Sequence, residues 1–237
     1  MPIVHWSPNA SLTQINSGAW DACYGGVADY LKQFNFTIML RLMWEFDGNW
    51  MLWQGCGQPF IDAWHRIVGI FQQHLATNVG FIWNPTENFD DQCADSSYPG
   101  DTYVDWVASD RYNPNNGTQV SPCHAGWAEW WELFNYYGNC TTSTVSKYVT
   151  YSSTKPFFVG ETGTKYDSTD VTRKGNWFRH IFNDSRAAPQ MPNLIGISYS
   201  DGILDNNTNN WLVDDPATQP DAYQGWKDLV ASSMFNP

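Results

Sequence analysis

Two glutamates stand out because each directly follows a continuous apolar segment of the kind that forms a buried strand. Glu45 follows the segment at residues 37–44, and Glu161 follows the segment at residues 156–160. Cleavage of a glycosidic bond needs two such carboxyl groups, one to protonate the leaving oxygen and one to attack or stabilise the anomeric carbon. One glutamate at a strand end is more often a cap or a solvated loop residue, so the hypothesis depends on the pair.

Charged and aromatic residues strengthen this hypothesis. Arg41 lies four residues before Glu45 on the same face of the predicted strand, where a guanidinium group can orient a carboxylate. The chain holds 14 Trp, 12 Tyr and 13 Phe, whereas only 15% of its residues are charged. Because Trp and Tyr stack on the C–H faces of sugars, the excess indicates carbohydrate binding, with an aromatic-rich core as the alternative explanation.

The net charge argues against polyanionic partners. Twelve Lys and Arg against 24 Asp and Glu give a net charge of -12, which repels phosphate backbones and anionic membrane surfaces. No stretch approaches the ~20 apolar residues of a membrane span. We therefore expect neither nucleic acid nor membrane as a partner. The sequence carries no nucleotide-binding or zinc motif, so we expect no cofactor and no metal.

Short apolar runs alternate with amphipathic segments along the chain, which predicts a parallel α/β architecture. The predicted strands are residues 2–6, 37–44, 79–83, 103–109, 156–160 and 194–199. The predicted helices are residues 18–35, 59–75, 126–137, 142–153, 171–183 and 220–234. Polar residues cluster after the strands, as on the active face of a (β/α)8 barrel. A doubly wound sheet is the alternative, although its usual nucleotide motifs are missing.

Helical spacing also predicts which faces are buried. In the helix at residues 18–35 the predicted face is Val27, Tyr30, Leu31 and Phe34. In the helix at residues 59–75 it is Phe60, Trp64, Ile67, Val68 and Phe71.

The cysteines favour an oxidising compartment. Cys56 and Cys93 follow successive predicted strands and can pair across adjacent loops, whereas Cys123 and Cys140 can pair within one loop region. Cys23 is then left over. Together with several N-x-S/T sequons and the acidic composition, this favours a secreted protein, although the chain opens without a signal peptide.

Several segments resemble glycoside hydrolase family 26, the β-mannanase family of the retaining (β/α)8 clan. Residues 41–50 read RLMWEFDGNW and are similar to the family segment R-x-x-H-E-x-N-G-x-W at the end of strand 4. Residues 155–163 read KPFFVGETG and are similar to K-P-x-x-x-x-E-x-G at the end of strand 7. The resemblance implies that Glu45 is the general acid/base and that Glu161 is the nucleophile.

Two segments between these motifs resemble further strands of the family. Residues 78–85 read NVGFIWNP, similar to strand 5, and residues 98–112 read YPGDTYVDWVASDRY, similar to strand 6. The resemblance implies that Tyr112 hydrogen-bonds the nucleophile and that Arg41 supports the acid/base. We expect the substrate to be bound by residues at or near strand ends, with packing as the alternative for each: His5, Trp44, Trp50, Trp53, Asp105 and Tyr199, and more weakly Trp211.

The chain departs from the family pattern in two ways. Trp44 stands where the family usually has His, and Asp47 stands where it has Asn, so activity or substrate can differ. The match also begins at the family's third strand, which leaves strands 1 and 2 without a counterpart. We therefore expect one catalytic domain over residues 1–237, N-terminally incomplete, with about six of eight β/α units. If the chain starts at Met1, an oligomer could cover the gap.

The sequence thus predicts a secreted, retaining, endo-acting glycoside hydrolase. β-1,4-Mannan is the expected substrate, and β-1,3-xylan and β-glucan are the alternatives. A catalytically weak or inactive carbohydrate-binding relative is the second hypothesis, motivated by Trp44 and the missing strands. A structural α/β domain without a sugar function is the third. A retaining mechanism requires the carboxyl groups of Glu45 and Glu161 to lie roughly 5–5.5 Å apart.

Overall fold

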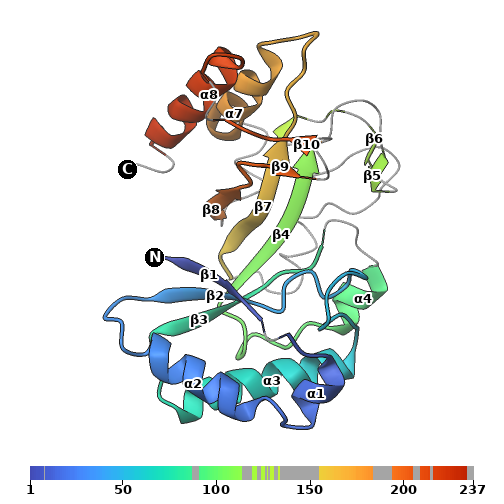
Figure 1. Cartoon of the computed structure of the whole chain (residues 1–237), viewed down its shortest axis with the longest axis vertical. Helices are drawn as coiled ribbons and strands as arrows, with labels where there is room; N and C mark the ends of the chain where they lie inside the picture. Colours follow the sequence, from blue (N-terminus) through green and yellow to red (C-terminus); the bar gives the residue numbers. More distant parts are fainter. Residues whose placement is uncertain are drawn as a thin grey trace. The chain divides into compact units, whose positions relative to one another are not determined.

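A computed structural model shows a chain that divides into two compact units, residues 1–109 and residues 110–237 (Figure 1). The strand β4 (Trp106–Asn113) crosses the boundary between them. The structure describes residues 1–7, 9–86, 91–113, 119–121, 124–125, 127, 129–130, 133, 155–183, 194–204, 209–213 and 216–233.

The strands of the main sheet follow one another in chain order, β1-β2-β3-β4-β7-β8. Their bounds are β1 (Ile3–Trp6), β2 (Ile38–Leu42), β3 (Val79–Trp83), β4, β7 (Phe157–Thr164) and β8 (Leu194–Tyr199). Pairing is parallel from β1 through β4 and between β7 and β8. This succession is that of a (β/α)8 barrel, whereas a doubly wound sheet reverses its order at a switch point. The predicted fold class is confirmed, with six of the eight strands among the described residues.

In the first unit, helices cover one face of the sheet formed by β1, β2 and β3 (Figure 1). They are α1 (Leu12–Asn16), α2 (Asp21–Leu31) and α3 (Gln58–Gln73), and a short α4 (Asp91–Ser96) follows β3. All five residues of β2 and all five of β3 are buried. The face predicted for α3 is confirmed, since Phe60, Trp64, Ile67, Val68 and Phe71 are buried. Its Phe71 ring packs edge-on against Phe81 of β3.

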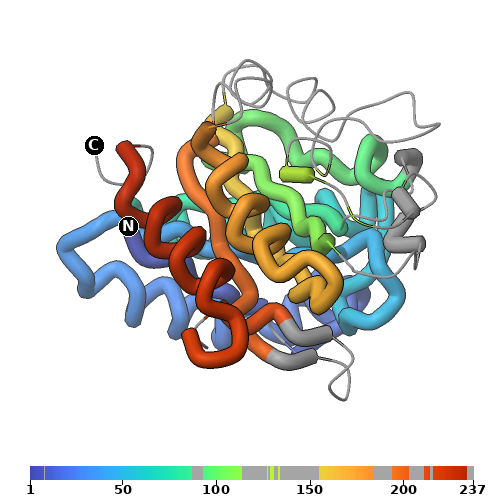
Figure 2. The backbone as a smooth tube through the Cα atoms, turned by 90° about the horizontal axis from the view of Figure 1, so that it is seen from above, coloured from blue at the N-terminus to red at the C-terminus, as the bar shows by residue number. Residues whose placement is uncertain are grey.

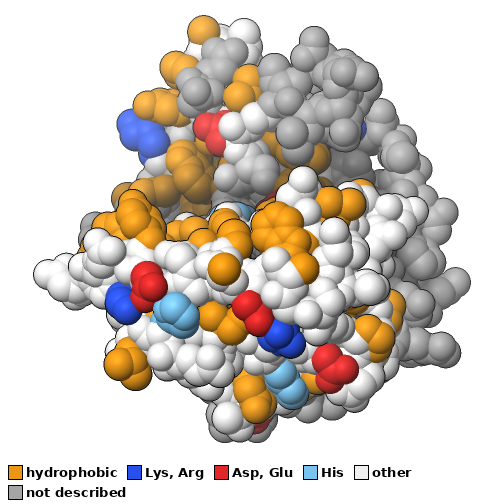
Figure 3. Space-filling view, turned by 60° about the horizontal axis from the view of Figure 1, so that its bottom comes forward, with side chains coloured by type: hydrophobic (Ala, Val, Ile, Leu, Met, Phe, Trp, Pro, Cys, Tyr) orange, Lys and Arg blue, Asp and Glu red, His pale blue; other side chains and the backbone are white. Residues whose placement is uncertain are grey.

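The face predicted for α2 is wrong except for Leu31. The helix instead buries Tyr24, Gly25, Ala28 and Leu31. A Cβ at Gly25 would lie 2.7 Å from the His74 ring, so the small residues let α2 approach α3 closely. Tyr30 is left 62% exposed. On the face that Figure 3 shows, acidic and basic side chains are interspersed with hydrophobic ones.

In the second unit, α7 (Arg173–Asn183) and α8 (Pro220–Ala231) lie side by side (Figure 2). They come closest at Gly175 and Gly225, where a Cβ on Gly225 would collide with the backbone of Gly175. Arg179 of α7 joins the pair by hydrogen bonds to Asp221 and Asp228 of α8. Two small antiparallel sheets complete the unit: β5 (Gln119–Ser121) with β6 (His124–Ala125), and β9 (Ile203–Leu204) with β10 (Asn209–Asn210).

Among the strands, β2, β4 and β7 depart most from their predicted bounds. β2 ends at Leu42 because Met43 adopts a left-handed backbone, with φ of 44°. β4 begins at Trp106 and runs on to Asn113, and β7 continues to Thr164, so Glu161 lies inside a strand. Most residues of the helices predicted at 126–137 and 142–153 lie outside the described part of the chain, as do Cys123 and Cys140.

The predicted disulfide between Cys56 and Cys93 is present, with the two Cα atoms 5.0 Å apart. It joins the loop after β2 to α4. Cys23 is an exposed free thiol, as the pairing scheme predicted. Among the residues that the structure describes, no helix is long and apolar enough to cross a membrane.

Candidate active site

Glu45 lies in a strained turn just after β2. Met43 and Glu45 have positive φ values of 44° and 53°, a region that costs non-glycine residues about 1–2 kcal/mol each. Such strain gathers at functional sites, where the surrounding structure holds it in place. Here the backbone N–H of Glu45 donates to the carbonyl of Asn84, 2.8 Å away at the end of β3. The turn thereby fixes Glu45 against the next strand end.

The side chain of Glu45 is held by its own loop. The indole N–H of Trp50 donates to Oε2 of Glu45 at 2.7 Å. Trp50 is 52% exposed, and its ring lies over Gly48, where a Cβ would come within 2.6 Å of the indole. A glycine at position 48 is therefore needed for this geometry. The predicted residues Glu45 and Trp50 are thus brought together, and Trp50 also presents an aromatic surface to solvent.

Arg41 places a fully buried positive charge at the ends of β1, β2 and β3. Its Nε donates to Oδ1 of Asn84 at 2.7 Å, and its Nη1 lies 2.9 Å from Nδ1 of His5, its partner in the β1–β2 register. The guanidinium also lies 5.4 Å from the ring centre of Trp44, a cation–π distance. Arg41, His5 and Trp44 thus form one cluster.

Trp53 supports this cluster from a more buried position. Its ring centre lies 5.0 Å from that of Trp44, and its indole N–H donates to the Trp44 carbonyl at 2.8 Å. Trp53 is only 8% exposed, whereas Trp44 is half-buried and meets the edge of His5. The contacts therefore leave Trp44 as the candidate for touching a sugar and give Trp53 a packing contact.

Two acidic residues of the first unit, Asp47 and Asp105, accept hydrogen bonds from backbone N–H groups. Asp47 accepts hydrogen bonds from the backbone N–H and the hydroxyl of Thr86, at 2.7 and 3.1 Å, and so ties the loop after β2 to the loop after β3. Asp105 lies before the start of β4, and its Oδ2 accepts the N–H of Phe81 at 2.8 Å. Because Asp105 precedes β4, whereas Tyr112 and Glu161 lie in the carboxyl-terminal halves of β4 and β7, we leave Asp105 out of the proposed site.

In the second unit, Glu161 of β7 is held by Tyr112 of β4. The Tyr112 hydroxyl donates to Oε2 of Glu161 at 2.6 Å and lies 2.8 Å from Oγ of Ser200, just after β8. Burial, with the nearby charge of Glu161, raises the pKa of Tyr112 far above its usual value, so the phenol stays protonated and remains a donor. The contact implied by the family resemblance is present. Ser200 is a neighbour that no sequence motif signalled.

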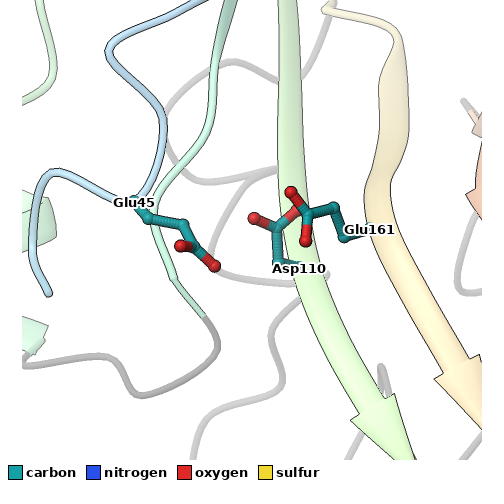
Figure 4. Close-up of side chains that lie close together, drawn as sticks. All are labelled: Glu45, Asp110 and Glu161. Carbon is teal, nitrogen blue, oxygen red and sulfur yellow. The ribbon is translucent and has the colours of Figure 1, made fainter. Parts of the chain in front are cut away.

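Asp110 lies beside this pair. It is 1% exposed and shares a face of β4 with Tyr112, two residues on. A carboxylate oxygen of Asp110 lies within 4.8 Å of one of Glu161, and Figure 4 shows the two groups facing one another, with Glu45 at its turn after β2.

Two further aromatic predictions have packing contacts. The ring of Tyr199 lies 5.2 Å from Phe178 of α7 and 5.3 Å from Trp226 of α8, and its hydroxyl donates to the Trp211 carbonyl at 2.8 Å. Tyr199 thus faces the helices. Trp211 is 6% exposed and stacks on Tyr112 at 4.2 Å, so its ring has no open face to offer a sugar.

Comparison with known proteins shows which sequences this chain is similar to. Residues 24–129 match the model of Glycosyl hydrolase family 26. Endoglucanase H of Acetivibrio thermocellus is 25% identical over 253 aligned residues, which cover 99% of this chain and 25% of that protein. Mannan endo-1,4-beta-mannosidase A and B of Caldalkalibacillus mannanilyticus is 30% identical over 96 residues, or 37% of this chain and 18% of that protein. The chain thus spans a quarter or less of these relatives.

Solved structures agree in fold. A GH26 beta-mannanase from Bacteroides ovatus has a TM-score of 0.60 at 16% identity and covers 93% of this chain and 59% of its own. A modular endo-beta-1,4-mannanase from Cellulomonas fimi has a TM-score of 0.62 at 16% identity and covers 92% of this chain and 47% of its own. At such identities the likeness shows the fold alone.

Proposed function

This chain is a relative of glycoside hydrolase family 26, and on that premise we propose that it is a retaining glycoside hydrolase acting on internal linkages of a β-linked polysaccharide. The observation that carries the proposal is the hydrogen bond from Tyr112 to Glu161. It holds a carboxylate, on a barrel strand, at the position that the family motif assigns to the nucleophile.

The proposed reaction has two steps. First, Glu45 gives its proton to the glycosidic oxygen while Glu161 attacks the anomeric carbon, which forms a glycosyl ester and releases the leaving sugar. Then the ionised Glu45 takes a proton from water, the water attacks the anomeric carbon, and the ester bond to Glu161 breaks. Each attack inverts the anomeric carbon, so the product keeps the β configuration. The mechanism requires the two carboxyl groups to lie roughly 5–5.5 Å apart.

Tyr112 contributes orientation and charge stabilisation. A neutral donor on Oε2 fixes the carboxylate plane of Glu161 before attack. Positioning of this kind lowers a barrier because the reacting atoms need not search for their geometry. Arg41 has the same type of function near Glu45, through Asn84, whose carbonyl accepts the Glu45 N–H.

β-1,4-Mannan is the substrate that we propose. A mannan endo-1,4-beta-mannosidase among the relatives and an endo-beta-1,4-mannanase among the fold neighbours support this choice. The relative named Endoglucanase H makes β-glucan the first alternative. Sugar contacts are assigned to Trp44, His5 and Trp50, which keep exposed surface in the first unit. We further propose that residues 1–237 act as one catalytic domain outside the cell, where the Cys56–Cys93 disulfide is stable.

A carbohydrate-binding relative without turnover is the second candidate. Trp44 occupies the place of the family histidine and packs against both Arg41 and His5. A bulky ring there could bind a sugar without letting it reach the position for attack.

The deciding experiment measures release of reducing ends from soluble mannan, β-glucan and β-1,3-xylan. Wild type is compared with Glu161→Ala and with Asp62→Ala, which removes an exposed carboxylate on α3 as a control. Release from mannan that is lost only in Glu161→Ala supports the proposal. Release from none of the polymers by folded wild type, with retained oligosaccharide binding, favours the second candidate.

A further inference from the structure

The ring of Tyr112 is backed by Trp211. The two ring centres lie 4.2 Å apart with 17° between the planes, a stacked arrangement. Trp211 is buried, and its indole N–H has no hydrogen-bond partner within the described part of the chain. The contact of Trp211 that bears on the site is therefore its face against Tyr112. Since Tyr112 donates to Glu161, Trp211 packs against the ring that carries this donor.

Each residue of the backbone segment that carries Trp211 makes at least one hydrogen bond. We call residues Trp211–Val213 the Trp211 loop. Trp211 donates its N–H to the Gly202 carbonyl at 3.0 Å, and its own carbonyl accepts the Tyr199 hydroxyl at 2.8 Å. The carbonyl of Leu212 accepts Nζ of Lys174 at 2.7 Å, and the N–H of Val213 donates to Oδ1 of Asp201 at 2.8 Å.

These anchors come from three different elements. Lys174 lies on α7, Tyr199 on β8, and Asp201 and Gly202 in the loop after β8. Lys174 has no exposed surface and also approaches Oε1 of Gln219 at 3.3 Å. The hydrogen bond from Lys174 to the Leu212 carbonyl is therefore shielded from water and links α7 to the loop.

Gly163 of β7 makes room for the stack. A Cβ at this position would lie 2.9 Å from the Trp211 indole and 3.1 Å from Cδ1 of Tyr112. A side chain at this position, two residues after Glu161, would displace one or both rings. The strand that carries Glu161 therefore leaves room for the Tyr112–Trp211 contact.

We propose that the Trp211 loop is a positioning device for Glu161, in which the Trp211 indole sets the Tyr112 ring and thereby the hydrogen bond to the carboxylate. Trp211 is a positioning residue that acts through Tyr112 and touches no sugar. The inference rests on the proposed function, because it assigns Glu161 a role in the reaction. It predicts that disturbing the loop lowers kcat and leaves KM nearly unchanged.

The test is a double-mutant cycle on an aryl β-mannoside or mannan. We expect Trp211→Leu to lower kcat about 10-fold with KM within about twofold, because a transition-state contact is lost. Trp211→Phe keeps a ring and should restore kcat to within about threefold of wild type. In a Tyr112→Phe background, which already lacks the donor, Trp211→Leu should lower kcat by less than about twofold, because the two residues act in series.

Gly163→Ala provides a second route if Trp211→Leu does not fold. It should produce a kcat defect that is likewise absorbed in the Tyr112→Phe background, with folding checked by near-UV circular dichroism. Equal losses of kcat in both backgrounds, or a loss confined to KM, would overturn the inference while an active wild type leaves the proposed function standing. An inactive, folded wild type would overturn both.

Discussion

The two candidate catalytic carboxylates are held in opposite ways. Glu45 lies on a strained turn outside its strand, and its side chain is met by an indole that is half exposed. Glu161 lies within β7, and its partner Tyr112 is backed by a buried indole on a fully anchored loop. Glu45 is held by contacts within its own loop, whereas Glu161 is held by contacts with other strands and loops of its unit.

This difference matches what the two proposed tasks demand. A general acid/base must change its protonation state twice in each cycle, so it needs contact with solvent and a partner that accommodates both forms. A nucleophile must hold one geometry, because a displacement of about 1 Å can cost a hundredfold in rate. On this proposal, the different surroundings of Glu45 and Glu161 give two chemically identical side chains different roles.

The largest predicted effect separates these roles by leaving group. Glu161→Ala should lower kcat on mannan and on an activated aryl β-mannoside alike, by at least about 10⁴-fold, since the attacking atom is gone. Glu45→Ala should lower kcat/KM to a comparable extent only on mannan, because an activated phenolate departs without a proton donor. Its kcat falls on both substrates, since Glu45 also activates the water of the second step. Steady-state kinetics on both substrates measures this contrast, and equal losses of kcat/KM for Glu45→Ala would contradict the assignment.

The next effect concerns the donor on Glu161. Tyr112→Phe removes a hydrogen bond to a charged group, typically worth 1.5–3 kcal/mol, so kcat should fall roughly 10- to 100-fold. Stopped-flow measurement of glycosylation of the enzyme should locate the loss in that step. Tyr103→Phe, which changes a tyrosine outside the site, is the matched control and should leave the rate of glycosylation unchanged.

A pH experiment tests the charge state of Lys174, the buried cation of the second unit. Burial lowers the pKa of Lys174 from 10.5 to about 7, so between these values the unfolded chain holds a proton that the folded chain lacks. The free energy of unfolding should therefore rise with pH through this window, and the cost of burying the charge should be complete below about pH 7.

Lys174→Met removes this dependence. Relative to wild type, the variant should lose up to about 1.4 kcal/mol of stability per pH unit across the window, as measured by urea unfolding at several pH values. A stability difference that stays flat with pH would show that Lys174 remains charged in the fold. Lys227→Met, at an exposed lysine on α8 near the Tyr223 ring, serves as the matched control variant.

The smallest effect is expected at Trp50. Its hydrogen bond to Glu45 is exposed, so water can replace the indole N–H in part. Trp50→Phe should lower kcat by no more than about 10-fold and leave the free energy of unfolding within about 0.5 kcal/mol, as for a surface site. Kinetics together with thermal unfolding checks both expectations. A loss as large as that of Tyr112→Phe would erase the contrast between the two settings.

Sequence reasoning succeeded where pattern and packing agree. β3, β8 and the buried face of α3 have uninterrupted apolar or helical spacing, and the structure places them as predicted. It failed on α2, where Gly25 and Ala28 form the contact and the predicted Tyr30 and Phe34 stay exposed. It also ended β7 too early, because Glu161 and the residues after it interrupt the apolar run although the strand continues to Thr164.

In the candidate site, too, some features could be predicted from the sequence and others could not. Strand-end motifs predicted roles for Glu45, Glu161, Arg41 and Tyr112, which stay predictions, whereas the hydrogen bond from Tyr112 to Glu161 is present. The aromatic residues were harder, because a tryptophan that stacks on a tyrosine and one that faces solvent look alike in a sequence. Trp50 and Trp211 differ only in what the loops around them cover. The turn at Met43 and Glu45 carried no glycine to signal its left-handed backbone.

Chemical rescue with azide tests the central claim most directly. Glu161→Ala and Glu45→Ala are each given an activated aryl β-mannoside and sodium azide, and the glycosyl azide is identified by NMR. If Glu161 is the nucleophile, azide replaces its carboxylate in one inverting step and gives the α-azide. If Glu45 is the acid/base, azide attacks the glycosyl ester on Glu161 and gives the β-azide. The account predicts these two opposite products, and the reverse pairing, or the same product from both variants, would contradict it.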